Sequence, residues 1–316
     1  MTRPDPTIEN WTIGLVGYGE VGRILAEDLR ARGVSRLVAS DIKLGKPAER
    51  PLIEHAGRHE VELVADPAAL AAEADLVISA VTASQAVAVA EAAAPGLRAG
   101  TWYLDFNSAS PGAKAKAMEL VRAGGGRFVE GAVMTSVPPY RIKVPLLLGG
   151  PDAAGLAPTL NGLGFAATVA DERLGVASAT KMCRSVMIKG LEAMVIESFT
   201  AARAYGVEDS VIASLKETFP EIDWEQLGAY FFQRVIQHGR RRAEEMRQVA
   251  QTVREAGLEP WSATGTAERQ DWVADLAEQG VFGPKDAEDF ARVDDWRVEA
   301  DRILAHRTAI DLRASS

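Results

Sequence analysis

The sequence predicts an α/β protein with an N-terminal doubly wound sheet, a long interdomain helix and an all-α C-terminal domain. In the first half of the chain, short apolar runs alternate with helical patterns, which is typical of a parallel sheet covered by helices on both faces. The pattern changes at Gly175, after which the chain is helical throughout. We therefore expect two domains, over residues 1–174 and 175–316.

Eight apolar runs predict the strands of the first domain. They fall near residues 11–17, 36–41, 61–64, 75–81, 101–106, 127–133, 143–150 and 166–170. Helical patterns separate several of them, so the strands should run parallel and be joined by crossover helices. Runs 75–81 and 101–106 are followed by small polar residues, and sheets of this kind bind ligands at those strand ends.

A single helical run extends from Val176 to Tyr205 and stops at Gly206. At 1.5 Å per residue this helix would be about 45 Å long, more than a small domain needs internally. It contains several charged side chains, so we do not expect it to cross a membrane. Further helices should follow, with turns near Gly206, Pro220, residues 257–260 and residues 280–284.

Composition limits the classes of partner. The 316 residues carry a net charge of −9, which argues against a general nucleic-acid or anionic-membrane binder, because such a protein needs a basic face. Cys183 is the single cysteine, which excludes an intramolecular disulfide and fits a reducing compartment. The polar N-terminus shows no apolar signal core, so we expect a cytoplasmic location.

Residues 13–41 indicate what the first domain binds. Gly17, Gly19 and Gly22 form G-x-G-x-x-G between a strand pattern and a helix pattern, and Asp41 closes the next apolar run. In this context the motif is the dinucleotide-binding fingerprint of a Rossmann-type domain. Its glycines allow a tight turn, a close approach to the pyrophosphate and close helix packing, while the helix N-terminus attracts the phosphates. The expected contacts are Gly17, Tyr18, Gly19, Glu20, Val21, Gly22 and Asp41.

Asp41 favours NAD over NADP as the cofactor. Its carboxylate can accept hydrogen bonds from the ribose hydroxyls and would repel a 2′-phosphate. Lys43 lies two residues later and could weaken this preference, so NADP stays open. A nicotinamide cofactor narrows the chemistry to hydride transfer or to the sensing of redox state.

Lys181 is the candidate for proton transfer to and from a substrate hydroxyl. The four histidines show no serine–histidine or metal-ligand spacing, and one cysteine cannot build a cysteine-based zinc site, so no metal is expected. Lys181 lies among apolar and small residues in the first turns of the long helix, where its amine can be partly desolvated. Ser185 lies one turn later on the same face.

These motifs resemble the β-hydroxyacid dehydrogenase superfamily, related to 3-hydroxyisobutyrate and 6-phosphogluconate dehydrogenases. The likeness rests on the fingerprint at residues 17–22, on Asp105-Phe-Asn-Ser-Ala-Ser-Pro111 and on Lys181 at the start of the interdomain helix. It implies that Lys181 is the catalytic acid/base and that the chain forms a homodimer through its helical domain. It also places four residues near the nicotinamide, namely Val81, Thr82, Asn107 and Ser108.

Residues 179–185 and 238–246 resemble a less characterised branch of the superfamily with its own helical C-terminal domain. Two departures from the family pattern concern the way in which the substrate is held. Met134, Thr135 and Ser136 stand in place of the substrate-anchoring Ser-Gly-Gly segment, and Ser185 replaces an asparagine. A hydroxy acid remains the expected substrate class, held in a different way. A non-catalytic NAD(P)-binding sensor or scaffold and an imine-reducing relative are the alternatives.

Several cations are candidate partners for a substrate carboxylate. Arg184, Arg141 and Lys143 can act as anion anchors, because guanidinium and ammonium groups bind carboxylates. Arg240–Arg242 are interpreted as a solvated helix face, with a role in substrate binding or dimerisation left open. The aromatic run at Tyr230–Phe232, with Trp224, is interpreted as core or as the lining of an aromatic-accepting site.

Overall fold

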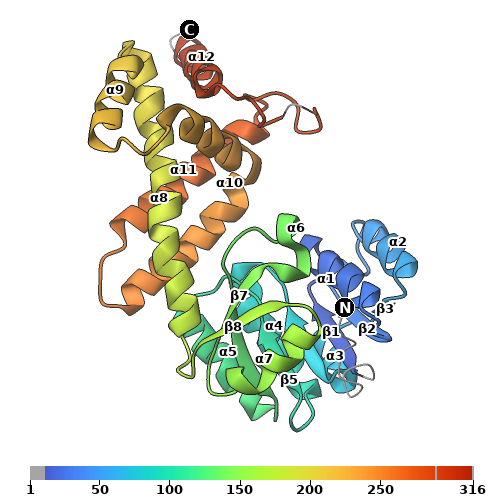
Figure 1. Ribbon diagram of the computed structural model, residues 1–316. Helices are drawn as coiled ribbons and strands as arrows, with labels where there is room; N and C mark the ends of the chain where they lie inside the picture. The colour runs from blue at the N-terminus through green and yellow to red at the C-terminus, as the bar shows by residue number, and fades with distance from the viewer. Residues whose placement is uncertain (1–10, 289, 315–316) are drawn as a thin grey trace. The chain divides into compact units, whose positions relative to one another are not determined.

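The computed structural model describes residues 11–288 and 290–314 and divides the chain into two units, Met1–Cys183 and Arg184–Ser316. An eight-stranded sheet forms the centre of the first unit (Figure 1). Its strands are β1 (Thr12–Val16), β2 (Arg36–Ser40), β3 (Glu62–Leu63), β4 (Leu76–Ser79), β5 (Trp102–Asp105), β6 (Arg127–Val133), β7 (Pro145–Gly149) and β8 (Ala166–Asp171). The predicted doubly wound sheet is confirmed.

The strand order is β3-β2-β1-β4-β5-β6-β7-β8. From β1 the chain first builds towards β3 and then continues with β4 on the opposite side of β1. Such a reversal leaves a crevice beyond the carboxyl ends of β1 and β4, which is the usual ligand site of an open α/β sheet.

One strand departs from the predicted parallel arrangement. β7 runs antiparallel to β6, with Glu130 opposite Gly149. Only residues 134–144 connect the two strands, and they form the short helix α6 (Val137–Tyr140) and the 3₁₀ turn η3 (Arg141–Lys143). A parallel connection needs a crossover of a dozen or more residues, so this short link can only return the chain in the opposite direction.

Helices cover both faces of the sheet because apolar side chains alternate along the strands. Leu15 and Ile78 belong to the core that contains buried residues of α1 (Glu20–Ala31), α2 (Arg50–Arg58) and α7 (Ala153–Gly162). Their neighbours Val16 and Val77 belong to the core formed with α3 (Pro67–Glu73), α4 (Ala86–Ala93) and α5 (Pro111–Ala123). This two-residue period is what a strand buried on both faces requires.

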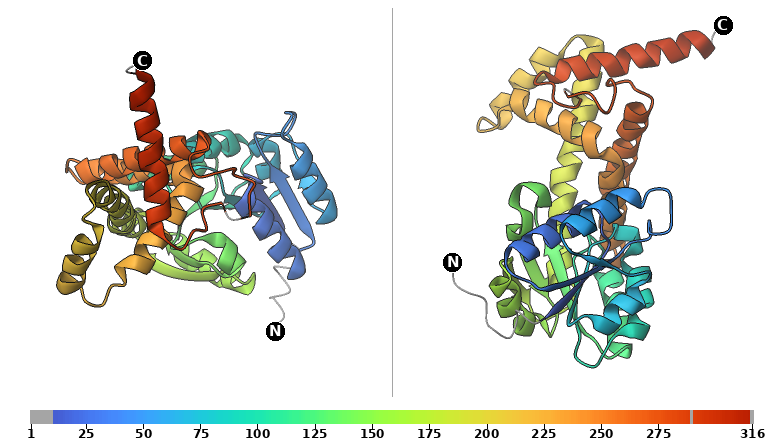
Figure 2. Two further views of the ribbon diagram at one scale, coloured as in Figure 1. Left: turned by 90° about the horizontal axis from the view of Figure 1, so that it is seen from above. Right: turned by 90° about the vertical axis from the view of Figure 1, so that its right-hand side faces the viewer.

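The second unit is helical, as expected. After α8 (Val176–Tyr205) it contains α9 (Glu208–Thr218), α10 (Trp224–Glu255), α11 (Trp261–Glu278) and α12 (Trp296–Ala314) (Figure 2). The core combines Phe199 of α8, Phe232 of α10, Val273 of α11 and Trp296 of α12. The core interpretation is therefore confirmed for Trp224, Phe231 and Phe232, whereas Tyr230 is exposed. Among the described residues, no helix is sufficiently long and apolar to span a bilayer.

Candidate active site

The glycine-rich turn between β1 and α1 leaves one side open for a ligand. Gly17 has φ +92°, and a Cβ there would lie 2.4 Å from the Ala80 carbonyl oxygen. A Cβ on Gly22 would lie 2.2 Å from the Gly17 carbonyl oxygen, so these two positions require glycine for the fold itself. A Cβ on Gly19, in contrast, would meet no protein atom within 4 Å. That open side is where a pyrophosphate can approach the backbone, so the turn fits a dinucleotide.

Tyr18 can contribute only its backbone to ligand binding at this turn, because its side chain is fully buried. Its hydroxyl lies 2.9 Å from His55 Nδ1, and burial raises the pKa of the phenol to about 12, so the phenol stays neutral. The Tyr18 N–H donates to Asp41 Oδ2 at 2.8 Å. Val21 is half-buried and Glu20 exposed at the start of α1.

Asp41 lies directly after β2 and is held in place by backbone hydrogen bonds. Besides the Tyr18 N–H, it accepts the N–H of Lys43 at Oδ1, at 2.9 Å. Each carboxylate oxygen has two lone pairs, so both can still accept a ribose hydroxyl. The backbone of Lys43 thus holds Asp41, while its side chain is exposed.

Asn107 ties together the ends of β4 and β5. Its Oδ1 accepts the N–H of Val81 at 2.7 Å, and its Nδ2 donates to Ser79 Oγ at 2.9 Å and to Asp105 Oδ1 at 2.7 Å. Both side-chain N–H groups are thereby used, and only the second lone pair of Oδ1 is left for a ligand. Asn107 therefore shapes the strand ends, and Val81 is positioned by it. Thr82 follows and is exposed.

A buried ion pair stabilises the carboxyl end of β5, next to Asn107. Lys114 of α5 and Asp105 of β5 are both almost completely buried, with 3.0 Å between Nζ and Oδ1. Lys114 also donates to the carbonyl oxygens of Asp105 and Gly131, at 2.9 and 3.4 Å. Removing one partner would leave an uncompensated buried charge, so the pair locks β5 to β6. This pair could not be predicted from the sequence, because a lysine in an amphipathic helix normally faces solvent.

The side chain of Lys181, on α8, extends to the loop that follows β5. Its Nζ donates to Ser108 Oγ at 2.5 Å, and its side chain is half-buried. Ser108 directly follows Asn107, so three predicted site residues meet at the carboxyl end of β5. Because β5 and β6 run parallel, Met134–Ser136, which follow β6, lie at this same edge of the sheet. Thr135 is exposed there.

Glu130 of β6 fixes the start of the helix that carries Lys181. It is fully buried, and its Oε1 accepts the N–H groups of Gly175 and Ala177 at 2.8 and 3.2 Å. Its Oε2 accepts the hydroxyl of Ser178 at 2.8 Å. A carboxylate at a helix N-terminus is stabilised by the partial positive charge there. The signal for this role in the sequence is a lone glutamate inside the apolar run 128–133.

The remaining predicted anion anchors have different environments. Arg141 forms ion pairs with Glu27 and Asp28 of α1, at 2.6 and 2.8 Å, so its charge is already neutralised. Lys143 is exposed. Arg184 and Ser185 follow Lys181 along α8 and belong to the second unit, where Arg184 is exposed and Ser185 buried.

The solvated helix face predicted for Arg240–Arg242 is correct for two of the three. Arg240 pairs with Asp271, Asp275 and Glu278 of α11, and Arg241 with Glu245 on its own helix. Arg242 contradicts the prediction, because it is buried and pairs with the buried Glu192 of α8. The apolar period of α10 could not show that α8 packs against the side of α10 that carries Arg242.

Comparison with known proteins agrees with this geometry. Residues 12–154 match the NAD binding domain of 6-phosphogluconate dehydrogenase, and residues 202–273 match a domain of unknown function, DUF1932. A conserved hypothetical protein from Sinorhizobium meliloti 1021 is 37% identical, covering 95% of this chain and 99% of that chain, with a TM-score of 0.73. The chain belongs to the β-hydroxyacid dehydrogenase superfamily.

Two further solved structures place this member of the superfamily. The conserved protein MTH1747, of unknown function and structurally similar to 3-hydroxyacid dehydrogenases, is 32% identical, covering 85% of this chain and 98% of that chain, with a TM-score of 0.66. The 3-hydroxyisobutyrate dehydrogenase of Mycobacterium tuberculosis is 16% identical, covering 93% and 99%, with a TM-score of 0.65. The latter likeness is one of fold. The N-terminal unit is thus an NAD(P)-binding domain.

Proposed function

We propose that this dehydrogenase homologue transfers hydride between a nicotinamide cofactor and a hydroxyl or carbonyl substrate, with Lys181 as the general acid/base. The observation that carries the proposal is the hydrogen bond between Lys181 Nζ and Ser108 Oγ at the carboxyl edge of the sheet. That edge is where the glycine-rich turn opens and where ligands bind in sheets of this topology. The substrate class we propose is a hydroxy acid.

The cofactor supplies the hydride acceptor, and the protein must handle the proton. A neutral Lys181 amine accepts the proton of the substrate hydroxyl during oxidation and returns it during reduction. The Ser108 hydroxyl accepts a hydrogen bond from the protonated amine and can donate one to the neutral amine, so it keeps Nζ oriented in both states. The proposed substrate contacts are Met134–Ser136 and Arg184. Ser185 is proposed as a second catalytic residue, which positions the substrate oxygen.

The hydrogen-bonding pattern at Asp41 supports NAD as the preferred cofactor. Each carboxylate oxygen accepts a hydrogen bond from a backbone N–H group, and these bonds fix the orientation of the Asp41 side chain. The carboxylate therefore cannot rotate to avoid electrostatic repulsion from a 2′-phosphate. NAD should therefore be used more efficiently than NADP. This preference is tested by measuring kcat/KM with NAD and with NADP on the same substrate.

The proposal is tested by following reduced-nicotinamide absorbance with hydroxy acids, sugar acids and aryl-substituted alcohols as substrates. We expect Lys181→Ala to lower kcat by about 10²- to 10⁴-fold, which is the usual contribution of a general acid/base. Lys116→Ala is the matched control, since Lys116 is an exposed lysine of α5. Turnover that survives in Lys181→Ala would assign the proton chemistry to another residue.

The assay also separates the alternatives. Tight NADH binding without turnover on any substrate would identify a sensor or scaffold. Turnover confined to carbonyl compounds supplied together with an amine would identify an imine-reducing enzyme.

A further inference from the structure

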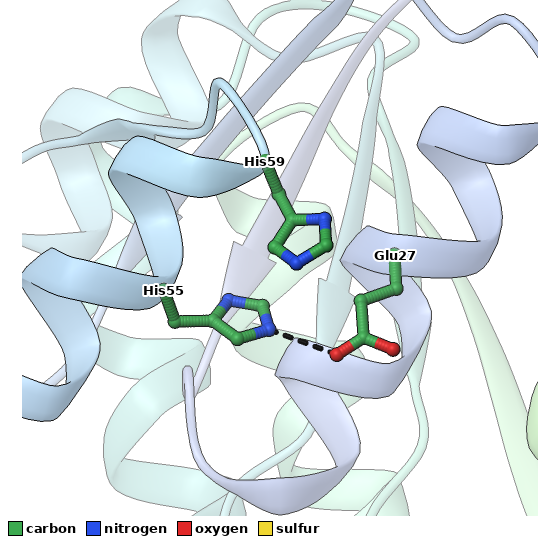
Figure 3. A group of neighbouring side chains, drawn as sticks. All are labelled: Glu27, His55 and His59. Atoms are coloured by element: carbon green, nitrogen blue, oxygen red, sulfur yellow. Dashed lines mark hydrogen bonds and ion pairs between the residues drawn. The ribbon is translucent and has the colours of Figure 1, made fainter.

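Three side chains on the nucleotide-binding unit form a compact set of nitrogen and oxygen donors outside the proposed active site (Figure 3). Glu27 comes from α1, His55 from α2, and His59 directly follows α2 as its C-terminal cap. One donor atom from each lies within 4.8 Å of the other two. His55 Nε2 lies 2.9 Å from Glu27 Oε1, and the imidazole rings of His55 and His59 stack with centroids 4.5 Å apart.

The donor set has the chemistry and spacing of a transition-metal site. Two imidazoles and one carboxylate are the ligands of many zinc sites that keep a fourth position open. Metal–ligand bonds of about 2.0–2.2 Å place neighbouring donors of a tetrahedral site about 3.3 Å apart. The pair His55–Glu27 already has nearly this separation. His59 is half-buried, and one of its ring nitrogens lies within 4.8 Å of both other donor atoms.

Neighbouring groups orient each donor, as they do in established metal sites. Tyr18 contacts His55 at Nδ1, which leaves Nε2 facing Glu27. Arg141 binds Oε2 of Glu27 at 2.6 Å, which leaves Oε1 facing the imidazole. Arg30 donates from Nε to the carbonyl oxygen of His59 at 2.9 Å and so holds the end of α2 against α1.

We propose that Glu27, His55 and His59 bind one Zn²⁺ ion, with water as the fourth ligand. A single carboxylate with two neutral imidazoles suits a divalent ion of intermediate softness and is a poor site for Mg²⁺ or Ca²⁺, which prefer oxygen donors. The ion would join α1 to the end of α2. Through Tyr18, it would also brace the glycine-rich turn from its buried side. The proposal does not depend on the dehydrogenase activity.

The test is a calorimetric Zn²⁺ titration of the full chain after treatment with a chelator. Wild type should bind one ion per chain. His59→Ala and Glu27→Gln should each weaken binding about tenfold or more, because loss of a ligand costs at least as much as loss of a supporting group. Glu54→Gln is the matched control, because Glu54 is an exposed carboxylate of α2 that forms an ion pair with Arg50. Its affinity should stay at the wild-type value.

A second readout guards against a folding artefact. Co²⁺ bound to the wild-type protein should show the visible absorption of a tetrahedral nitrogen and oxygen site, and this spectrum should change in His59→Ala while its far-ultraviolet circular dichroism does not. The proposal is overturned if wild type shows no saturable binding. It is equally overturned if Zn²⁺ binds His59→Ala and Glu27→Gln as tightly as wild type.

Discussion

Glu130 shows how one residue can position a side chain that it does not touch, here the proposed acid/base Lys181. Its carboxylate accepts three hydrogen bonds, from Gly175 just before α8 and from Ala177 and Ser178 in its first turn. Lys181 lies one turn after Ser178. Glu130→Gln keeps the shape of the side chain but replaces one of the two acceptor oxygens with an amide NH₂ group, which cannot accept a hydrogen bond. We expect a loss of about 1–3 kcal/mol in the free energy of unfolding, the cost of unmaking charged, buried hydrogen bonds.

The same variant should affect kcat more than cofactor affinity, because the glycine-rich turn does not involve Glu130. Urea unfolding, NADH titration and steady-state kinetics measure the three quantities. Glu130→Asp should recover part of the stability, and Glu62→Gln, at an exposed carboxylate of β3, should behave as wild type. An unchanged kcat in Glu130→Gln would show that the start of α8 is held in another way.

At the scale of elements, α10 carries a histidine that should make stability depend on pH. Burial lowers the pKa of His238 to about 4, and the nearby cations Arg241, Arg234 and Arg242 act in the same direction. An unfolded histidine has a pKa of about 6.5. Between these two values the unfolded chain binds a proton that the folded chain does not, so stability falls as the pH falls from about 6.5 towards 4.

From pH 7 to pH 5, the wild type should therefore lose about 1–2 kcal/mol more unfolding free energy than His238→Gln, after allowance for partial solvent screening. Urea unfolding at the two pH values measures this difference. Gln237→Ala, at the exposed neighbouring position, should retain the wild-type dependence. Parallel curves for wild type and His238→Gln would contradict the prediction.

At the scale of the whole molecule, we propose that the chain is a homodimer formed through its helical unit. Large apolar side chains remain exposed there, including Met187, Met194, Tyr205 and Trp261, with 62–84% of their surface accessible. Met187 and Met194 lie two turns apart on the same face of α8, and exposed apolar residues mark association surfaces when they are grouped. Sedimentation equilibrium should give twice the chain mass of 33.8 kDa.

Met194→Lys should shift that mass towards the monomer, because a charge on an apolar interface must be desolvated. Ile53→Lys places the same charge on an exposed apolar position of α2 and should leave the mass unchanged. A wild-type mass equal to that of one chain would remove the proposal.

The order of strands and helices, the G-x-G-x-x-G turn and the long helix with Lys181 could all be predicted from the amino-acid sequence. These features depend on local patterns: the period of apolar residues and the short-range requirements of glycine at a tight turn. His55 and His59 were also visible at a helical spacing, yet they indicated nothing alone, because their carboxylate partner Glu27 lies on another helix.

The contacts between side chains from distant parts of the chain could be seen only in the tertiary structure. Glu130 contacts the start of α8, and Lys114 pairs with Asp105, because strands and helices distant in the chain are packed together. Arg242 is buried rather than solvated because α8 covers that side of α10. The antiparallel course of β7 follows from the short connection after β6. Burial and charge pairing are properties of the packed chain, so no pattern along one element could specify them.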